Sequence, residues 1–81
     1  MPKLKILSGQ EIVKIFLIFS FSVAAQKGSH IKLVRILPDG TRQTLTIPGH
    51  PELDKGTIKA IYRQALRYIP ESELKPYFYS Q

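Results

Sequence analysis

The chain has 81 residues, with 12 Lys and Arg against 6 Asp and Glu and a formal net charge of +6. This length allows one small domain with a single core, which we place at about residues 7–69 with a C-terminal tail at 70–81. The excess of positive charge favours an anionic partner such as nucleic acid, an anionic membrane or an acidic protein. The absence of cysteine excludes disulfides and thiolate metal sites.

The first predicted element is a helix from Gly9 to about Phe19. Ser8 and Glu11 have the spacing of a capping box, which marks the start of a helix. Apolar side chains then recur at helical spacing and mark the face that we expect to be buried. They are Ile12, Ile15, Phe16 and Phe19.

The same region imitates a secretory signal peptide. Lys3 and Lys5 precede an apolar run from Ile15 to Val23, and small residues follow it. A secreted or membrane-associated product therefore stays open as a third alternative. The run is too short to span a bilayer as a helix, and Lys14 interrupts the apolar stretch.

Three segments have the composition of β-strands, roughly Phe21 to Lys27, His30 to Leu37 and Thr41 to Ile47. The two-residue loop Gly28-Ser29 joins the first two as a hairpin. The three-residue loop Pro38-Asp39-Gly40 joins the second and third.

A second helix is expected from Ile58 to about Leu66, with Thr57 as its N-cap. Pro70 then ends the helical pattern, and a short terminal helix is expected over Ser72 to Tyr79. The order α-β-β-β-α predicts an α+β fold in which two helices cover one face of a three-stranded antiparallel sheet. This order, with a basic second helix, has the outline of a double-stranded-RNA-binding domain.

One face of the sheet is expected to be open. Pairing across the second hairpin puts Leu33 opposite Leu45, on an apolar face that packs on the helices. The open face then mixes basic, hydroxyl and apolar side chains, which indicates a binding surface. They are Lys27, His30, Lys32, Arg42, Thr44, Thr46, Val23, Val34 and Ile36. A bulge at Gly40 would reverse the faces of the third strand.

His30 is the candidate for chemistry. In a two-residue hairpin, Lys27 and His30 are directly opposed with side chains on the same face. An imidazole beside an ammonium group can perform acid–base chemistry on a phosphodiester. His50, between two prolines, is expected to be structural or to contact phosphate. No carboxylate pairs with a histidine at ligand spacing, so we expect no metal and no cofactor.

Basic residues of the second helix form a candidate phosphate track. Lys55 stands where free backbone N–H groups begin the helix, and Lys59 and Arg63 lie one turn apart on its solvent side. A plain helix cap and a solvated helix face are the alternatives, and both stay open.

Several motifs together resemble the HicA-like (YcfA-like) family of messenger-RNA interferase toxins, from Leu7 to about Leu66. They are Leu7-Ser8-Gly9-Gln10-Glu11, Lys27-Gly28-Ser29-His30, Pro38-Asp39-Gly40, Ile47-Pro48, His50, Glu52-Leu53, Gly56-Thr57-Ile58, Ile61 and Gln64-Ala65. The chain departs from the family at Ser20-Phe21, where a Gly-Phe step is usual. It also has Ile31 and Lys32 where a polar or aromatic pair often follows the histidine.

The resemblance implies a cytoplasmic, ribosome-independent endoribonuclease that cleaves mRNA without metal. Its single catalytic histidine maps onto His30, supported by Lys27, Gly28 and Ser29, and a HicB-type antitoxin covers the active face. His30 would act as general base on a 2′-hydroxyl or as general acid on the leaving oxygen, with water or Lys27 as second proton carrier. The predicted RNA-binding residues are Lys27, Lys32, Arg42, Lys55, Lys59 and Arg63. The alternative is a non-catalytic module of the same fold that binds RNA or protein.

Overall fold

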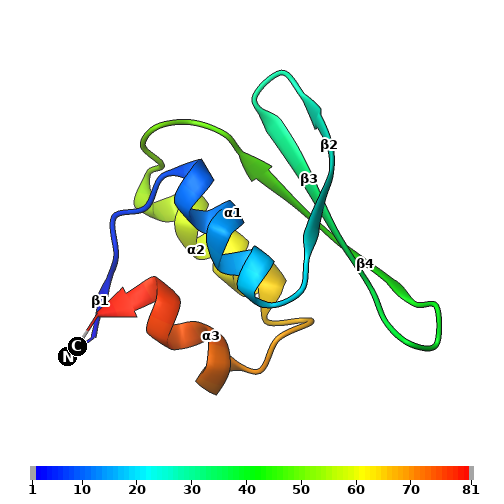
Figure 1. Ribbon diagram of the computed structural model, residues 1–81. Helices are drawn as coiled ribbons and strands as arrows, with labels where there is room; N and C mark the ends of the chain where they lie inside the picture. The colour runs from blue at the N-terminus through cyan, green and yellow to red at the C-terminus, as the bar shows by residue number, and fades with distance from the viewer. Residues whose placement is uncertain (1, 81) are drawn as a thin grey trace.

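The computed structural model describes residues 2–80, and Figure 1 shows a sheet on one side of a set of helices. The elements are β1 (Lys3–Leu4), α1 (Gly9–Ile18), β2 (Ser22–Lys27), β3 (His30–Ile36), β4 (Arg42–Pro48), α2 (Lys55–Ala65), α3 (Glu71–Phe78) and β5 (Tyr79–Ser80). β2, β3 and β4 pair antiparallel in that order, and both α1 and α2 contact β4. The predicted α-β-β-β-α fold with an added C-terminal helix is confirmed.

α1 begins at the predicted capping box. The Ser8 hydroxyl accepts from the backbone N–H of Glu11 at 3.1 Å, and the Glu11 carboxylate accepts from the backbone N–H of Ser8 at 2.8 Å. Hydrogen bonding of the Glu11 carboxylate to the Ser8 backbone, and then to the Ser8 side chain, holds the pKa of Glu11 below its usual value. The apolar residues Ile12 and Phe16 are fully buried, so α1 belongs to the core. No helix within residues 2–80 combines the length and the apolar character needed to cross a membrane.

α1 ends in a Schellman motif. The backbone N–H groups of Ser20 and Phe21 donate to the carbonyls of Leu17 and Phe16, each at 3.1 Å. The rings of Phe16 and Phe21 meet edge to face at 5.8 Å, which is the hydrophobic contact typical of this motif. Ser20 has φ = 72°, a left-handed conformation that glycine adopts at much lower cost.

α2 begins at Lys55 and its N-cap is Asp54, so the prediction of Thr57 as N-cap is wrong. The Asp54 carboxylate accepts from the backbone N–H of Thr57 at 3.2 Å. Hydrogen bonding with the Thr57 side chain, and then with its backbone, lowers the pKa of Asp54. With Asp54 as N-cap, the buried residues Leu53 and Ile58 take the N′ and N4 positions of a hydrophobic staple. A cap at Thr57 would put Gly56 at N′ and lose that contact.

The core lies between the sheet and the helices, and α3 closes it from the side away from the sheet. Leu74 and Phe78, which lie on the short terminal helix predicted in the C-terminal tail, are fully buried. The Phe78 ring lies 6.0 Å from that of Phe16 and 5.2 Å from that of Tyr62, so α3 packs on both other helices. The Tyr62 hydroxyl also donates to the carboxylate of Glu71 at 2.9 Å.

β1 and β5 form a separate antiparallel ribbon that the sequence analysis did not predict. Lys3 pairs with Ser80 and Leu4 with Tyr79, so the two ends of the described chain lie side by side (Figure 1). Strands of two residues are too short to show the alternation on which strand prediction depends.

Gly40, with φ = 89°, takes the left-handed position of the three-residue loop, but the β3–β4 register is continuous from the pair His30–Pro48 to the pair Ile36–Arg42, so the faces of β4 are not reversed. A bulge occurs in β2, between Val23 and Ala25. The extra residue reverses the faces of the preceding part of the strand. Val23 therefore lies opposite Leu33, and its prediction on the His30 face is wrong.

Candidate active site

The β2–β3 turn has the predicted form. Gly28 has φ = 59°, and Ser29 is not in the left-handed region, which is the pattern of a type II′ hairpin turn. Lys27 and His30 are register partners that close the hairpin, and both are exposed. The Gln26 side-chain amide donates to the carbonyl of Gly28 at 3.3 Å. The turn thus presents a histidine and a lysine side by side to solvent.

Two further segments meet this turn. The backbone N–H of Gly49 donates to the carbonyl of Ser29, and the N–H of Gly9 donates to the carbonyl of His50 at 2.9 Å. A Cβ on Gly49 would lie 3.2 Å from both the Ser29 carbonyl oxygen and a methyl group of Ile31. Hydrogen bonds and close backbone contacts therefore join the turn, the loop after β4 and the start of α1.

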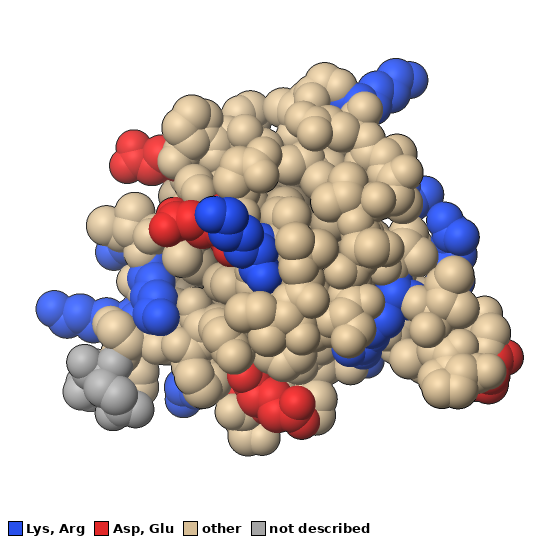
Figure 2. All heavy atoms as spheres, viewed as in Figure 1, with Lys and Arg blue, Asp and Glu red and all other residues tan. Residues whose placement is uncertain are grey.

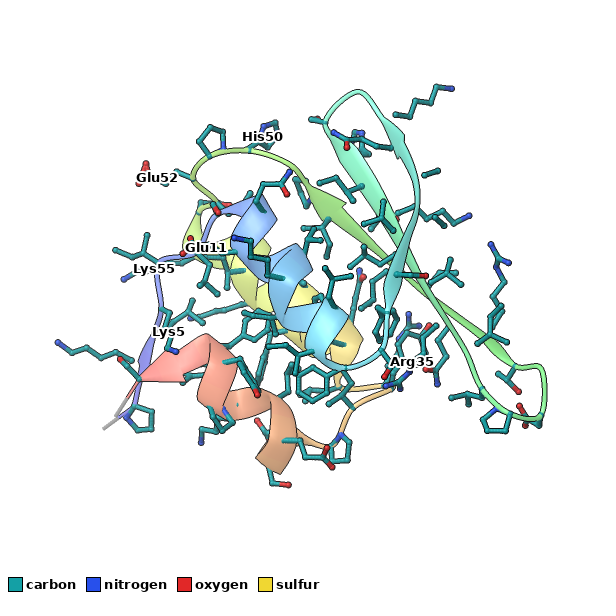
Figure 3. The ribbon with its side chains drawn as sticks, in the orientation of Figure 1. Lys5, Glu11, Arg35, His50, Glu52 and Lys55 are labelled. Atoms are coloured by element: carbon teal, nitrogen blue, oxygen red, sulfur yellow. The ribbon has the colours of Figure 1, made fainter. Side chains whose placement is uncertain are left out.

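Both histidines lie at this end of the sheet. His30 pairs with Pro48, and His50 follows Pro48 by two residues on the loop that leads from β4 to α2 (Figure 3). The His50 side chain is exposed, and its backbone carbonyl supports α1. Within residues 2–80, no group of three or more His, Asp or Glu side chains is arranged to hold a metal ion.

The register gathers several predicted residues on the sheet face away from α1 and α2, which we call the open face. Lys27 and Lys32 flank His30 there, and Lys32 lies opposite Thr46. Arg42 is on the same face, but it pairs with Ile36 at the other end of β3, about 20 Å along the strand from His30. Lys32 is therefore the nearer basic residue and Arg42 the distant one.

The predicted phosphate-binding residues of α2 do not lie on one common surface. Lys55 is its first residue, and Figure 3 shows it on the side of the molecule away from the β2–β3 hairpin. The Asp54 carboxylate already accepts from an N–H group at this helix end. Arg63 lines a groove between α2 and β4, whereas Lys59 is exposed and does not line it.

Arg35 is an important basic residue that the sequence analysis did not assign. Its guanidinium donates to the carbonyls of Phe19 at 3.0 Å and Tyr68 at 2.9 Å, and to the Gln43 side chain at 2.8 Å. It also lies over the Phe21 ring, 4.8 Å from the centroid. Arg35 faces the helices. It connects the sheet to the segments that directly follow α1 and α2, so its role is structural. Strand alternation, which puts it in phase with Leu33, was the signal for this role.

Net charge does not by itself locate the site. Figure 2 shows Lys and Arg side chains standing singly at several points of the viewed face, without one continuous basic patch. The strand register, which puts Lys27, His30 and Lys32 together, is the more specific indication.

The family model described as "HicA toxin of bacterial toxin-antitoxin" matches residues 9–66. This chain belongs to the HicA toxin family. HicA toxins are mRNA interferases of toxin–antitoxin systems, and the family implies RNA as substrate class and a HicB antitoxin as partner. Comparison with curated proteins and with solved structures gave no match.

HicA membership accounts for the motifs that the structure brings together at Gly9, the β2–β3 turn and the loop after β4. The departure at Ser20 also has a structural meaning, because Ser20 is the only non-glycine residue within residues 2–80 with positive φ. A glycine at this position, as the resemblance predicts for the family, would avoid that strain. The match to the HicA family ends at Leu66, so Arg67, α3 and β5 lie beyond it.

Proposed function

We propose that this HicA toxin cleaves RNA with His30 as the proton-transferring group and without a metal ion. The observation that carries the proposal is the pairing of exposed His30 with Lys27 across a turn that is held by Gly49 and, through the same loop, by α1. Such support fixes the imidazole on a rigid part of the fold, which positioning of a reacting phosphodiester requires.

In this mechanism, His30 accepts the proton of the 2′-hydroxyl while the O2′–P bond forms and the P–O5′ bond breaks. The reverse assignment, in which His30 donates a proton to the leaving 5′-oxygen, is consistent with the same geometry. Lys27 stabilises the negative charge that develops on the phosphoryl oxygens. Water or Lys27 carries the second proton.

The RNA backbone is bound by basic residues of the open face and of α2. Lys32 follows His30 by two residues on the same face, about 7 Å away, so it contacts a phosphate next to the scissile one. Lys27 and Arg42 extend the contacts along the open face. The α2 residues proposed to bind phosphate are Lys55, Lys59 and Arg63.

A HicB-type antitoxin is proposed to cover the open face around His30, in the cytoplasm. Support comes from the mixed chemistry of this face, where Ile36 is exposed beside Arg42. An apolar side chain among basic ones suits a protein that must also displace an anionic substrate.

The test is cleavage of a labelled single-stranded RNA by the purified protein, its His30→Ala variant and its His50→Ala variant, with and without EDTA. His30→Ala is expected to lower the cleavage rate at least about 100-fold, which is typical for loss of a general acid–base group. His50→Ala is the matched control, because it removes the other exposed imidazole at this end of the sheet and keeps the backbone carbonyl that accepts from Gly9. Full activity of His30→Ala, or loss of wild-type activity in EDTA, overturns the mechanism.

The second candidate function is a non-catalytic RNA- or protein-binding module. It is favoured by Ile31, a buried hydrocarbon side chain that supplies no acid or base next to His30 in the sequence. Such a module binds RNA with a steep salt dependence and leaves it intact. Induction in a bacterial host separates the two functions, because growth arrest and mRNA loss that require His30 are expected only of the enzyme.

A further inference from the structure

β4 is an edge strand of the three-stranded sheet, and a groove of about 690 Å³ lies along this edge, between open-face residues of β4 and one side of α2. Its volume falls in the range of about 300 to 1,000 Å³ that is usual for ligand sites. Its lining offers two guanidinium groups, two hydroxyl groups and an amide, and no carboxylate. The lining residues are Thr44, Thr46, Ala60, Arg63, Gln64 and Arg67. These side chains are the kinds that bind phosphate and ribose oxygens.

The groove adjoins the candidate active site. Thr46 lies opposite Lys32, one pair further along the open face than the pair His30–Pro48. Thr44 continues the wall by one more pair, so the groove begins about 7 Å along the strand from His30. Three further hollows in residues 2–80 lie near the chain ends, and one of them is also lined by the α1 residues Glu11 and Lys14.

Arg67 is held at the end of this groove by neutral groups. Its guanidinium lies 5.2 Å from the centroid of the Tyr68 ring, and it donates to the Tyr68 hydroxyl and the Gln64 carbonyl, each at 3.3 Å. Tyr68 is itself fixed, because its carbonyl accepts from Arg35 and its ring lies 6.3 Å from that of Phe21. These contacts orient the planar guanidinium group of Arg67 and leave its positive charge available to an anion.

We propose that the α2–β4 groove binds the stretch of single-stranded RNA that leaves the His30 centre, and that Arg67 is a phosphate-binding residue there. The inference rests on the proposed function, because it takes His30 as the cleavage site. A single strand is favoured over a duplex because the groove has a helix on one side and a strand on the other. Duplex recognition by shape instead uses contacts spread over about 16 base pairs.

The experiment measures binding of a fluorescent single-stranded RNA to His30→Ala protein, which separates binding from cleavage. Added Arg67→Gln and Arg63→Gln substitutions are each expected to weaken binding about three- to tenfold. Each is also expected to reduce the slope of log K against log salt by about 0.7, the value for one contact to a single strand. Lys75→Gln on α3 removes an equal charge outside the groove and is the matched control.

Arg67→Gln also removes the contact of Arg67 with Tyr68, so a second variant tests the groove without changing that contact. Ala60→Glu adds a negative charge to the exposed α2 wall without removing a contact, and it is expected to weaken RNA binding by a similar factor. Unchanged RNA affinity in both Arg67→Gln and Ala60→Glu overturns the proposal that the groove binds RNA. Effects confined to duplex RNA overturn the single-strand assignment. If the wild-type protein does not cleave RNA but the groove variants lose binding, the proposed catalysis fails, whereas RNA binding by the groove and Arg67 stands.

Discussion

Gly9 and Pro48 lie so close that a side chain at position 9 has no room: a Cβ there would be 2.0 Å from the Pro48 carbonyl oxygen and 2.9 Å from the Cα of Gly49. The first residue of α1 therefore lies directly on the backbone of β4 that pairs with His30. This contact links the packing of α1 to the position of the candidate catalytic histidine.

Gly9→Ala is expected to lower the free energy of unfolding by about 1–3 kcal/mol, as overpacking of a filled site does, and to reduce RNA cleavage. Gly56→Ala is the matched control, because its Cβ would meet only the Asp54 carboxylate at 3.6 Å. In the first turn of α2, alanine is expected to stabilise by up to about 1 kcal/mol. Urea denaturation compares the two, and equal stabilities would contradict the close contact.

Ser20→Gly is expected to raise the free energy of unfolding by about 0.5–1 kcal/mol, because glycine adopts the positive φ of this C′ position without strain. Ser20→Ala keeps the Cβ and is expected to change stability by less than about 0.5 kcal/mol. Denaturant midpoints of the three proteins give the comparison. A glycine variant no more stable than the alanine variant would show that the conformation carries no strain.

Arg35→Lys is expected to destabilise the protein by about 2–4 kcal/mol, since it keeps the charge but loses the fork that reaches Phe19, Gln43 and Tyr68. The exposed Arg42→Gln serves as control, with an expected change within about 0.5 kcal/mol. Thermal and urea unfolding measure both variants. If both variants lose less than about 0.5 kcal/mol of unfolding free energy, the three hydrogen bonds of Arg35 make no net contribution to stability.

The Tyr62–Glu71 contact predicts a loss of stability in alkali. Burial, and then the hydrogen bond to Glu71, raise the pKa of Tyr62 from 10.0 to about 12. The stabilisation is therefore complete below pH 10 and is lost as the pH rises toward about 12, because the unfolded chain loses the tyrosine proton first. The Tyr62→Phe variant lacks this term, so its stability difference from wild type should shrink between pH 9 and pH 12. A difference that stays constant over that range would rule out the linkage.

The parts of the fold that the sequence predicts are those fixed by short-range chemistry. The capping box at Ser8 starts α1, and the loops at Gly28 and Gly40 set the strand register. Asp54 and Thr57 are both good caps, and the contact of Leu53 with the core decides between them. The bulge near Val23 has no glycine to mark it, so alternation alone puts that residue on the wrong face.

The site is predictable to a similar extent. Lys27 and His30 face each other because a two-residue loop requires it, and the HicA resemblance gives that pair its importance. The contacts of Gly9 and Gly49 join segments that are distant in sequence, so no local pattern predicts them. Arg67 enters the groove only when the end of α2 is placed beside β4.

The β1–β5 ribbon has a consequence for the order in which the molecule opens. It joins Lys3 to Ser80, residues 77 positions apart, through strands of two residues each. The ends are brought together by the buried residues Leu7 and Phe78, so the ribbon itself adds only a few backbone hydrogen bonds. With so few hydrogen bonds at the chain ends, its amide hydrogens are expected to exchange with solvent by local opening. Because Phe78 is anchored in the core, such opening is confined to the chain ends and leaves the hairpin that carries His30 intact.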